Sequence, residues 1–265
     1  MRVFALIMPY YENPAMLARQ YAHLATLSED LRDCIDLIIC DDGSPNHPAT
    51  PPAGTEERVE YDLPADDHFA MRENGEAAAL GLRSFQLWRV DVDVRWNWLT
   101  CRNIGAKYAD VQWLLMTDID HLLPEATARR IIEGPLDPAW AYRFNRVDAP
   151  DMKPTIGKHG ERKPHPNTWL MTKALFDKVG GYDERFSGFY GSDGEFRDRV
   201  KRHAQIGILP EVMIRVPREV VPDASTTRYG RKEEQDAVGI AAARARIARE
   251  GGRPLRLSFP YHRVV

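Results

Sequence analysis

WLLMTDIDHLLPE, residues 113–125, joins a short apolar run to a cluster of polar side chains. Four apolar residues predict a buried strand, which is interrupted by Thr117, Asp118, Ile119, Asp120 and His121. Residues two apart on an extended chain point the same way, so Asp118 and Asp120 are expected to face one site. Two neighbouring carboxylates repel unless a cation lies beside them. Mg²⁺ or Mn²⁺ prefers oxygen ligands and also binds phosphate oxygens, so the stretch predicts a strand that ends on a divalent metal site.

In the sequence before this stretch, predicted strands and helices alternate. VFALIM (3–8) and IDLIIC (35–40) are apolar runs of strand length, and PAMLARQYAHLATL (14–27) has helical spacing between them. This order predicts an α/β fold with a parallel sheet. RSFQLWRVDVDV (83–94) alternates like a half-buried strand, and CRNIGAKYA (101–109) has a helical pattern.

Residues 46–82 read as irregular chain with a short helix over 72–81, because Pro, Asp, Glu, Gly and Ala are frequent there. Further helices are expected at EFRDRVKRHA (195–204) and at the amphipathic EEQDAVGIAAARARIAREGG (233–252).

Composition sets the class of protein. The chain has 265 residues and 43% hydrophobic content, enough for one large domain or one domain with a C-terminal appendage. No apolar run approaches membrane-spanning length and no signal peptide precedes VFALIM, so we expect a cytoplasmic protein without a membrane span. The three cysteines lack C-x-x-C spacing, which favours buried thiols over disulfides or zinc binding.

Charge divides unevenly along the chain. Residues 1–150 contain 14 basic and 24 acidic residues, whereas residues 151–265 contain 22 and 15. This asymmetry is compatible with an acidic partner for the second half, or with solvated helix faces.

Polar clusters follow each of the buried strands. Pro9-Tyr10-Tyr11-Glu12 follows the first, Asp41-Asp42-Gly43 the second, and Asp118-Ile119-Asp120-His121 the run at 113–117. Ligands of open α/β sheets bind outside the carboxyl ends of the strands. The coincidence therefore predicts one binding site built from these clusters.

The order of these motifs resembles a known enzyme family. PYYE (9–12), DDGS (41–44), CRNIGA (101–106), TDID (117–120) and VGGYDERFSGFYGSDGEFRDR (179–199) are together similar to the nucleotide-sugar glycosyltransferases of family 2. The resemblance covers roughly residues 1–205. It implies a GT-A fold, with a Rossmann-like, mostly parallel central sheet and flanking helices. On this resemblance, residues 1 to about 120 form a nucleotide-binding half and residues from about 121 to 205 an acceptor-binding half. Residues 206–265 are expected to form a C-terminal helical extension, with a possible lid and an amphipathic helix.

The same resemblance implies roles for single residues. Tyr11 corresponds to the aromatic residue that stacks on the donor base, Asp42 to the carboxylate that binds the uracil edge, and Arg102 to an arginine near the base. Asp118 corresponds to a residue that contacts the ribose or the metal, and Asp120 to the direct metal ligand. The implied donor-nucleotide set is Pro9, Tyr11, Glu12, Asp42, Arg102 and Asp118.

Asp193 corresponds to the family's catalytic base. The family pattern usually reads Gly-Glu-Asp, whereas this chain has Gly191-Ser192-Asp193, which puts in doubt the acceptor contacts of the missing acid. A carboxylate in hydrogen-bond reach can take the acceptor's proton, and direct displacement then inverts the anomeric centre. Asp193 could instead cap the helix expected at 195–204.

Other residues give weaker predictions. Trp96 and Trp98 fit either the donor cleft or the core. A third metal ligand is left open among His121, His165 and His262. The basic segment 153–169 is expected near the sugar and acceptor pockets. STTRYGRK (225–232) reads either as a linker or as a lid whose Arg228 or Arg231 reaches the diphosphate.

The predicted function is therefore that of an inverting glycosyltransferase that depends on Mn²⁺ or Mg²⁺ and uses a UDP-sugar as donor. The acceptor is an unidentified hydroxyl compound, for which a glycan or a small molecule is favoured. Two alternatives stay open: a non-catalytic nucleotide- or glycan-binding module, and a glycosyltransferase for hydroxymethylated bases in DNA. A nucleotidyltransferase is disfavoured because MPYYENP lacks a glycine-rich phosphate loop.

Overall fold

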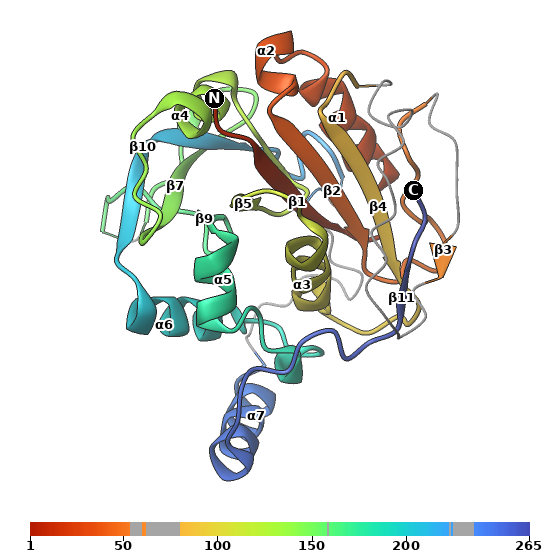
Figure 1. Cartoon of the computed structure of the whole chain (residues 1–265), viewed down its shortest axis with the longest axis vertical. Coiled ribbons are helices and arrows are strands. Elements are labelled where there is room, and N and C mark those ends of the chain that lie inside the picture. The colour runs from red at the N-terminus through yellow and green to blue at the C-terminus, as the bar shows by residue number, and fades with distance from the viewer. Residues whose placement is uncertain (54–59, 62–79, 158, 223, 225–235) are drawn as a thin grey trace.

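The computed structural model describes residues 1–53, 60–61, 80–157, 159–222, 224 and 236–265. These residues form one eleven-stranded β-sheet with helices on both faces (Figure 1). The strand order is β3-β11-β4-β2-β1-β5-β9-β7-β10-β6, and β8 pairs with β7 outside this path. The predicted α/β class is confirmed.

Four neighbouring strands, β4, β2, β1 and β5, pair in parallel. β1 pairs in parallel with both β2 and β5, and β2 pairs in parallel with β4. The strands are β1 (Phe4–Tyr10), β2 (Ile35–Asp41), β4 (Ser84–Val90) and β5 (Trp113–Met116). The helices among them are α1 (Pro14–Leu24), α2 (Glu29–Arg32) and α3 (Trp98–Tyr108). α1 begins where the Asn13 side chain accepts a hydrogen bond from the amide of Met16 at 3.0 Å.

The second part of the sheet mixes directions. β9 is antiparallel to β5 and β7, whereas β7 is parallel to β10. The sheet as a whole is therefore mixed: the expected parallel pairing holds for β4, β2, β1 and β5, and antiparallel pairs join on either side of these strands. Apolar periodicity identifies a buried strand but carries no information on its direction. The elements are β6 (His121–Leu122), α4 (Glu125–Glu133), β7 (Ala141–Asp148), β8 (Lys153–Pro154), β9 (Trp169–Thr172), α5 (Lys173–Val179), the 3₁₀ turn η1 (Glu184–Phe186), α6 (Asp193–His203) and β10 (Ile206–Arg215).

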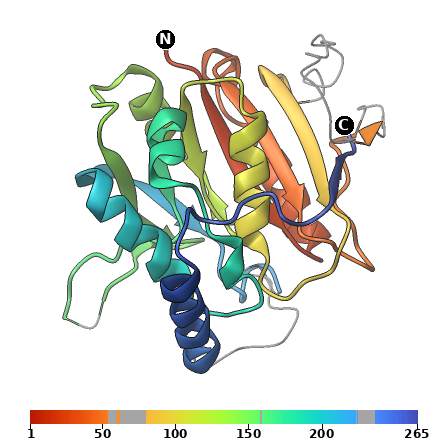
Figure 2. The same ribbon diagram turned by 60° about the horizontal axis from the view of Figure 1, so that its bottom comes forward.

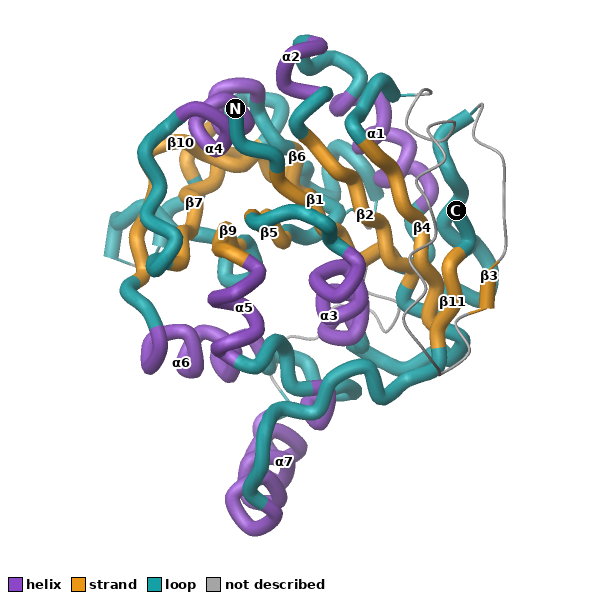
Figure 3. Tube along the Cα trace, viewed as in Figure 1, coloured by secondary structure: helices purple, strands orange, loops and turns teal. Residues whose placement is uncertain are grey.

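Residues after 205 contribute to the same sheet. β10 lies between β7 and β6, and β11 (Tyr261–Arg263) pairs antiparallel with β4 and with β3 (Glu60–Tyr61), as Figure 3 shows. α7 (Ala237–Glu250) projects from the body (Figure 2). The domain boundary after 205 stays a prediction, although the sheet continues across it.

Element limits differ locally from the predictions. The helix predicted from residue 101 begins at Trp98, the strand predicted to 94 ends at Val90, and the amphipathic helix spans Ala237–Glu250. The predicted short helix at 72–81 lies almost entirely outside the described residues. No helix in the described ranges is long and apolar enough to cross a membrane.

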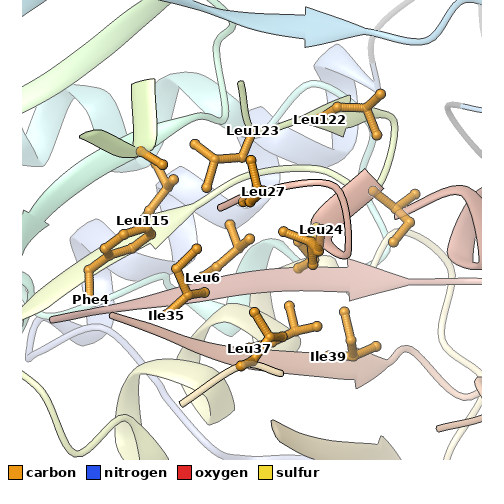
Figure 4. Packing of buried hydrophobic residues seen from close by; sticks show 14 of the residues in the cluster. Phe4, Leu6, Leu24, Leu27, Ile35, Leu37, Ile39, Leu115, Leu122 and Leu123 are labelled. Carbon is orange, nitrogen blue, oxygen red and sulfur yellow. The ribbon is translucent and has the colours of Figure 1, made fainter. Parts of the chain in front are cut away.

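Two apolar layers sandwich the sheet. Phe4, Leu6, Leu37 and Leu115 pack with Leu24 of α1 and with other side chains on one face (Figure 4). The opposite layer contains Ala5, Ile7, Ile38, Leu114 and Met116 together with residues of α3, α5 and α6. The alternation along β1 explains this division, because successive side chains point to opposite faces. All three cysteines are free and buried, as predicted.

Candidate active site

The carboxyl ends of β1, β2 and β5 lie next to one another. The strand register pairs Tyr10 with Asp41 and Ile7 with Met116. The amide of Thr117 continues the second pairing by donating to the carbonyl oxygen of Ile7 at 3.1 Å. The polar clusters at 9–12, 41–43 and 118–121 therefore leave the sheet at one edge, where ligands of α/β folds bind.

Two carboxylates organise the loop after β2. Asp41 accepts hydrogen bonds from the amides of Ser44 (2.9 Å) and Ala49 (2.8 Å), and burial raises the pKa of Asp41. Glu12 accepts a hydrogen bond from the amide of Asn46 at 2.7 Å. Glu12, which the resemblance assigns to donor binding, thus holds this loop, and Pro9 is buried within β1.

Asp42 and Gly43 lie against the chain that follows β4. Asp42 is buried, and its amide donates to the carbonyl oxygen of Tyr10 at 2.9 Å. Gly43 has a φ of +73°, and a Cβ there would lie 2.4 Å from the carbonyl oxygen of Val92. Only glycine fits this approach. The Tyr11 hydroxyl donates to Asp93 at 3.3 Å, so residues 92–93 contact both strand ends.

Arg102 of α3 is fully buried. Gly105 permits the close approach of α3 to β1, since a Cβ would lie 2.4 Å from Cγ2 of Ile7. Arg102 Nη2 donates to Asp118 Oδ1, and Nη1 donates to the carbonyl oxygen of Asn167 and to the Tyr182 hydroxyl, the last at 3.0 Å. These contacts fix Asp118 from the interior of the protein.

Aromatic rings enclose the Arg102 guanidinium. Its centre lies 4.9 Å from the ring of Trp98 and 5.5 Å from that of Tyr182. Trp98 therefore packs against the Arg102 guanidinium. Trp96 instead contacts the ring of Tyr190, with 4.9 Å between the ring centroids. Trp96 has a φ of +53°, which is unusual for a bulky residue.

Asn167 connects the two acids that the sequence places 75 positions apart in the numbering, Asp118 and Asp193. Its Nδ2 donates to Asp118 Oδ2 at 3.4 Å, and its side chain lies beside Asp193. Burial, followed by the charge of Asp118, raises the pKa of Asp193, and the neighbouring Asn167 side chain partly offsets this. Asp118, Arg102 and Asp193 thus form one cluster.

Ser192, not Asp193, occupies the cap position of α6. Its side chain makes no capping hydrogen bond, and within the described residues its buried Oγ has no partner. Asp193 is the first residue of the helix. The carboxylate of Asp193 is therefore available for a role other than capping.

The backbone around Asp120 is held from two sides. Gln20 of α1 is buried and donates to the carbonyl oxygens of Ile119 (2.6 Å) and His121 (2.9 Å). The amide of Val216, just after β10, donates to the carbonyl oxygen of Asp120 at 2.8 Å. The turn that presents Asp120 is consequently anchored by residues distant in sequence.

The three candidate histidines have different surroundings. His121 Nδ1 lies 2.7 Å from Asp120 Oδ1, and its ring lies against that of His165, with 4.0 Å between the centroids and 32° between the planes. His165 Nε2 lies 3.4 Å from Asp118 Oδ2, and burial lowers the pKa of His165 well below its usual range. His262 instead pairs with Asp91 at 2.5 Å on β11.

A divalent ion fits these residues only with substrate oxygens as additional ligands. Among the described residues there is no group of three or more His, Cys, Asp or Glu side chains spaced to hold a metal. Asp118 is engaged by Arg102, while no described residue donates to Oδ2 of Asp120. Mg²⁺ is commonly held by one or two carboxylates, water and phosphates, which this arrangement permits.

Sequence patterns do not point to Asn167, Tyr182 or Gln20. Asn167 lies in the basic segment 153–169 and Tyr182 in the GGYDERF motif, but neither pattern indicates a role for these two residues. Gln20 interrupts the apolar face of the helix at 14–27, and this buried polar position was a detectable signal. Arg228 and Arg231 lie outside the described residues.

Solved structures of glycosyltransferases resemble this chain. S. aureus TarS 1-349 in complex with UDP-GlcNAc matches with a TM-score of 0.56 and 13% identity, covering 86% of this chain and 61% of that chain. The same protein in complex with UDP gives 0.54 and 13%, covering 82% and 61%. The catalytic domain of Drosophila beta1,4-galactosyltransferase 7 in complex with xylobiose gives 0.51 and 12%, covering 92% and 80%.

The chain thus spans about three fifths of the length of the TarS chain it matches. No family model matches the sequence, and no curated protein matches it either. The structural likeness confirms the predicted resemblance to GT-A glycosyltransferases at the level of the fold.

Proposed function

We propose that the chain is an inverting glycosyltransferase that moves a sugar from a UDP-sugar to an acceptor hydroxyl with the help of Mn²⁺ or Mg²⁺. The observation that carries the proposal is the cluster of Asp193, Asn167, Asp118 and Arg102 at the carboxyl edge of a GT-A-like sheet. Support for the donor comes from TarS, whose structures contain UDP-GlcNAc and UDP.

Asp193 is the proposed catalytic base. Its raised pKa makes the carboxylate a better proton acceptor than an exposed aspartate, and a positioned base of this kind removes the acceptor proton during attack on the anomeric carbon. Asn167, which donates to Asp118 and lies beside Asp193, would orient the two acids relative to each other. Attack from the face opposite the leaving group inverts the configuration.

The donor is proposed to lie across the ends of β1, β2 and β5. Tyr11 would stack on the base and Asp42 would bind the uracil edge, while Asp118, held by Arg102, would contact the ribose. Pro9 and Glu12 support this region through β1 and the loop after β2. Arg228 and Arg231 remain proposed contacts of the diphosphate.

Asp120, with Asp118 beside it, would hold the divalent ion. The ion would neutralise the charge that develops on the leaving diphosphate. His121 orients Asp120 through the 2.7 Å contact, and Gln20 fixes the turn on which both residues lie. The function therefore needs an intact turn at 119–121 as well as the carboxylate.

The test is UDP release from a panel of UDP-sugars with Mn²⁺, combined with calorimetric titration of UDP. Wild type is expected to bind UDP in a metal-dependent manner and to release UDP slowly without an acceptor. Asp120→Asn is expected to remove the metal dependence, whereas Asp33→Asn, an exposed control, should behave like wild type. UDP binding that is equally tight with and without metal in wild type would contradict the proposal.

The acceptor screen distinguishes the remaining options. Soluble glycans, small alcohols and DNA with hydroxymethylated bases are offered with the best donor. A protein that binds UDP but never releases it from any donor, with any acceptor, is a binding module instead of an enzyme.

A further inference from the structure

Tyr182 is buried in the short segment between α5 and η1, and its backbone is fastened to α3. The amide of Tyr182 donates to Oδ1 of Asn103 at 2.9 Å, and Nδ2 of Asn103 donates to the carbonyl oxygen of Tyr182, also at 2.9 Å. Asn103 directly follows Arg102 on α3. The backbone of Tyr182 is therefore fixed to the same turn of helix that carries the buried guanidinium of the candidate active site.

The hydroxyl of Tyr182 supports that guanidinium. Arg102 Nη1 donates to the hydroxyl at 3.0 Å, while Nη2 of the same group donates to Asp118. Because the guanidinium is planar and rigid, the acceptor of Nη1 restricts the direction in which Nη2 can donate. The Tyr182 hydroxyl thus helps to decide where Asp118 is held.

The ring of Tyr182 packs against α6. It stacks on Phe196, with 4.0 Å between the ring centroids and 18° between the planes. Phe196 lies three residues after Asp193, the first residue of the helix, and residues at this spacing are neighbours on a helix surface. Three residues later again, Arg199 donates to the carbonyl oxygen of Gly181. Two successive turns of α6 are therefore held by the segment 181–182.

Other rings also touch Phe196, but less closely. The centroid of Trp169 lies 5.8 Å away at 82°, and that of Phe176 lies 5.9 Å away at 45°. Of the three rings, that of Tyr182 is the nearest, and its hydroxyl accepts from Arg102. Phenylalanine would fill the same space in the core, so packing alone explains the ring and leaves the hydroxyl unexplained.

The charges around the phenol agree with this placement between two acids. Burial raises the pKa of Tyr182 to about 12, the Arg102 guanidinium acts in the opposite direction, and the charges of Asp118 and Asp193 add to the increase. The phenol consequently keeps its proton at neutral pH. Tyr182 is close enough to both carboxylates to feel their charge.

We infer that Tyr182 is a positioning residue that sets Asp118 and Asp193 relative to each other, through Arg102 by its hydroxyl and through Phe196 by its ring. This inference rests on the proposed function, since that function makes Asp118 a donor contact and Asp193 the base. A displacement of about 1 Å between reacting groups can cost about a hundredfold in rate, so the distance between the two acids matters for transfer. The hydroxyl is then expected to govern donor binding, and the ring the chemical step.

The test separates the two contacts with variants of the full chain. Tyr182→Phe removes only the hydroxyl, Phe196→Leu removes only the partner ring, and Tyr182→Leu removes both contacts. Tyr142→Phe and Phe4→Leu are the matched controls, because both residues are buried in the apolar layer on the opposite face of the sheet. The Tyr142 hydroxyl is also hydrogen-bonded, since it accepts from the amide of Asp137 at 2.7 Å.

UDP affinity is measured by calorimetry with Mg²⁺, and kcat is measured as UDP release from the best UDP-sugar with water as the acceptor. Tyr182→Phe is expected to bind UDP about tenfold more weakly, as for the loss of one hydrogen bond to a charged group, with little change in kcat. Phe196→Leu is expected to lower kcat about ten- to a hundredfold with little change in UDP affinity, because α6 and Asp193 lose their stacked contact. Tyr182→Leu should show both losses, and Tyr142→Phe and Phe4→Leu neither.

UDP affinity in Tyr182→Phe equal to that of wild type overturns the inference. An equal loss in Tyr142→Phe also overturns it, because general loosening of the core would then explain both results. So does a Phe196→Leu protein that loses UDP affinity as strongly as kcat, or that loses neither. If Phe196→Leu does not fold, Phe196→Met keeps more of the volume, and the same separation of kcat from UDP affinity is expected.

Hydrogen exchange of backbone amides distinguishes failure of this inference from failure of the proposed function. If wild type does not bind UDP, or does not release it from any donor, the glycosyltransferase proposal fails and exchange judges the positioning alone. The amides of Thr117 and Glu195, beside the two acids, donate to backbone carbonyl oxygens and are suitable reporters. Tyr182→Leu is expected to exchange both amides faster than Tyr142→Phe does. Equal exchange of either amide in these two proteins overturns the inference.

Discussion

Replacing Arg102 with methionine tests whether this buried guanidinium is what positions Asp118. Arg102 Nη2 donates to Asp118 and Nη1 to Asn167 and Tyr182, and the side chain is fully buried. Methionine fills a similar volume without charge or donors. The substitution therefore leaves Asp118, the Asn167 carbonyl oxygen and the Tyr182 hydroxyl without their shared donor.

The expected cost follows from these contacts. Breaking a buried charge pair by removing one partner costs about 3–5 kcal/mol, and the 31% exposure of the Asp118 side chain places this case near the lower limit, about 3 kcal/mol. For a chain of this size, that corresponds to a decrease of roughly 6–10 °C in Tm. UDP affinity is expected to fall in parallel, because Asp118 loses its orientation.

Arg102→Lys is the matched variant. One ammonium group can keep the ion pair with Asp118, but it cannot reach all three acceptors in the planar arrangement of the guanidinium. We expect a smaller loss, about 1–2 kcal/mol, and UDP affinity closer to wild type. Chemical denaturation gives the free energies of unfolding, and calorimetry gives the UDP affinity. An Arg102→Met protein whose unfolding free energy lies within about 0.5 kcal/mol of wild type would refute this account of the cluster.

Further predictions concern chemistry and donor binding. Asp193→Asn should leave the fold and UDP affinity near wild type and lower transfer about a hundred- to ten-thousandfold, because only proton removal is lost; transfer within a few-fold of wild type rejects the base assignment. Tyr11→Ala and Asp42→Ala should raise the donor KM in steady-state transfer assays with little change in kcat. A large decrease in kcat with an unchanged KM would contradict the assignment of these residues to the nucleotide site. The rate should increase with pH through the raised pKa of Asp193, since the base acts deprotonated. Asn167→Ala should move this acidic limb of kcat/KM to higher pH, because it removes a neighbouring side chain that lowers the pKa of Asp193, and an unmoved limb would contradict that influence.

Features that depend on neighbours in sequence could be predicted directly. The apolar runs of β1, β2 and β5 and the acids that follow them are local patterns, and parallel pairing brings their ends together as expected. The order of the motifs also pointed to the GT-A fold, which the structural comparisons support. Asp118, Arg102 and Asp193 were candidates on these grounds alone.

Tertiary structure decided how those candidates are connected. Asn167 touches both Asp118 and Asp193, Gln20 holds the turn at 119–121, and β10 and β11 enter the sheet from the segment expected to be an extension. Each of these contacts joins residues far apart in the chain, and no periodicity or spacing encodes which strand pairs with which. The same reason applies to the ion pair of Arg215 and Asp148, because only the parallel packing of β7 beside β10 brings these two residues together.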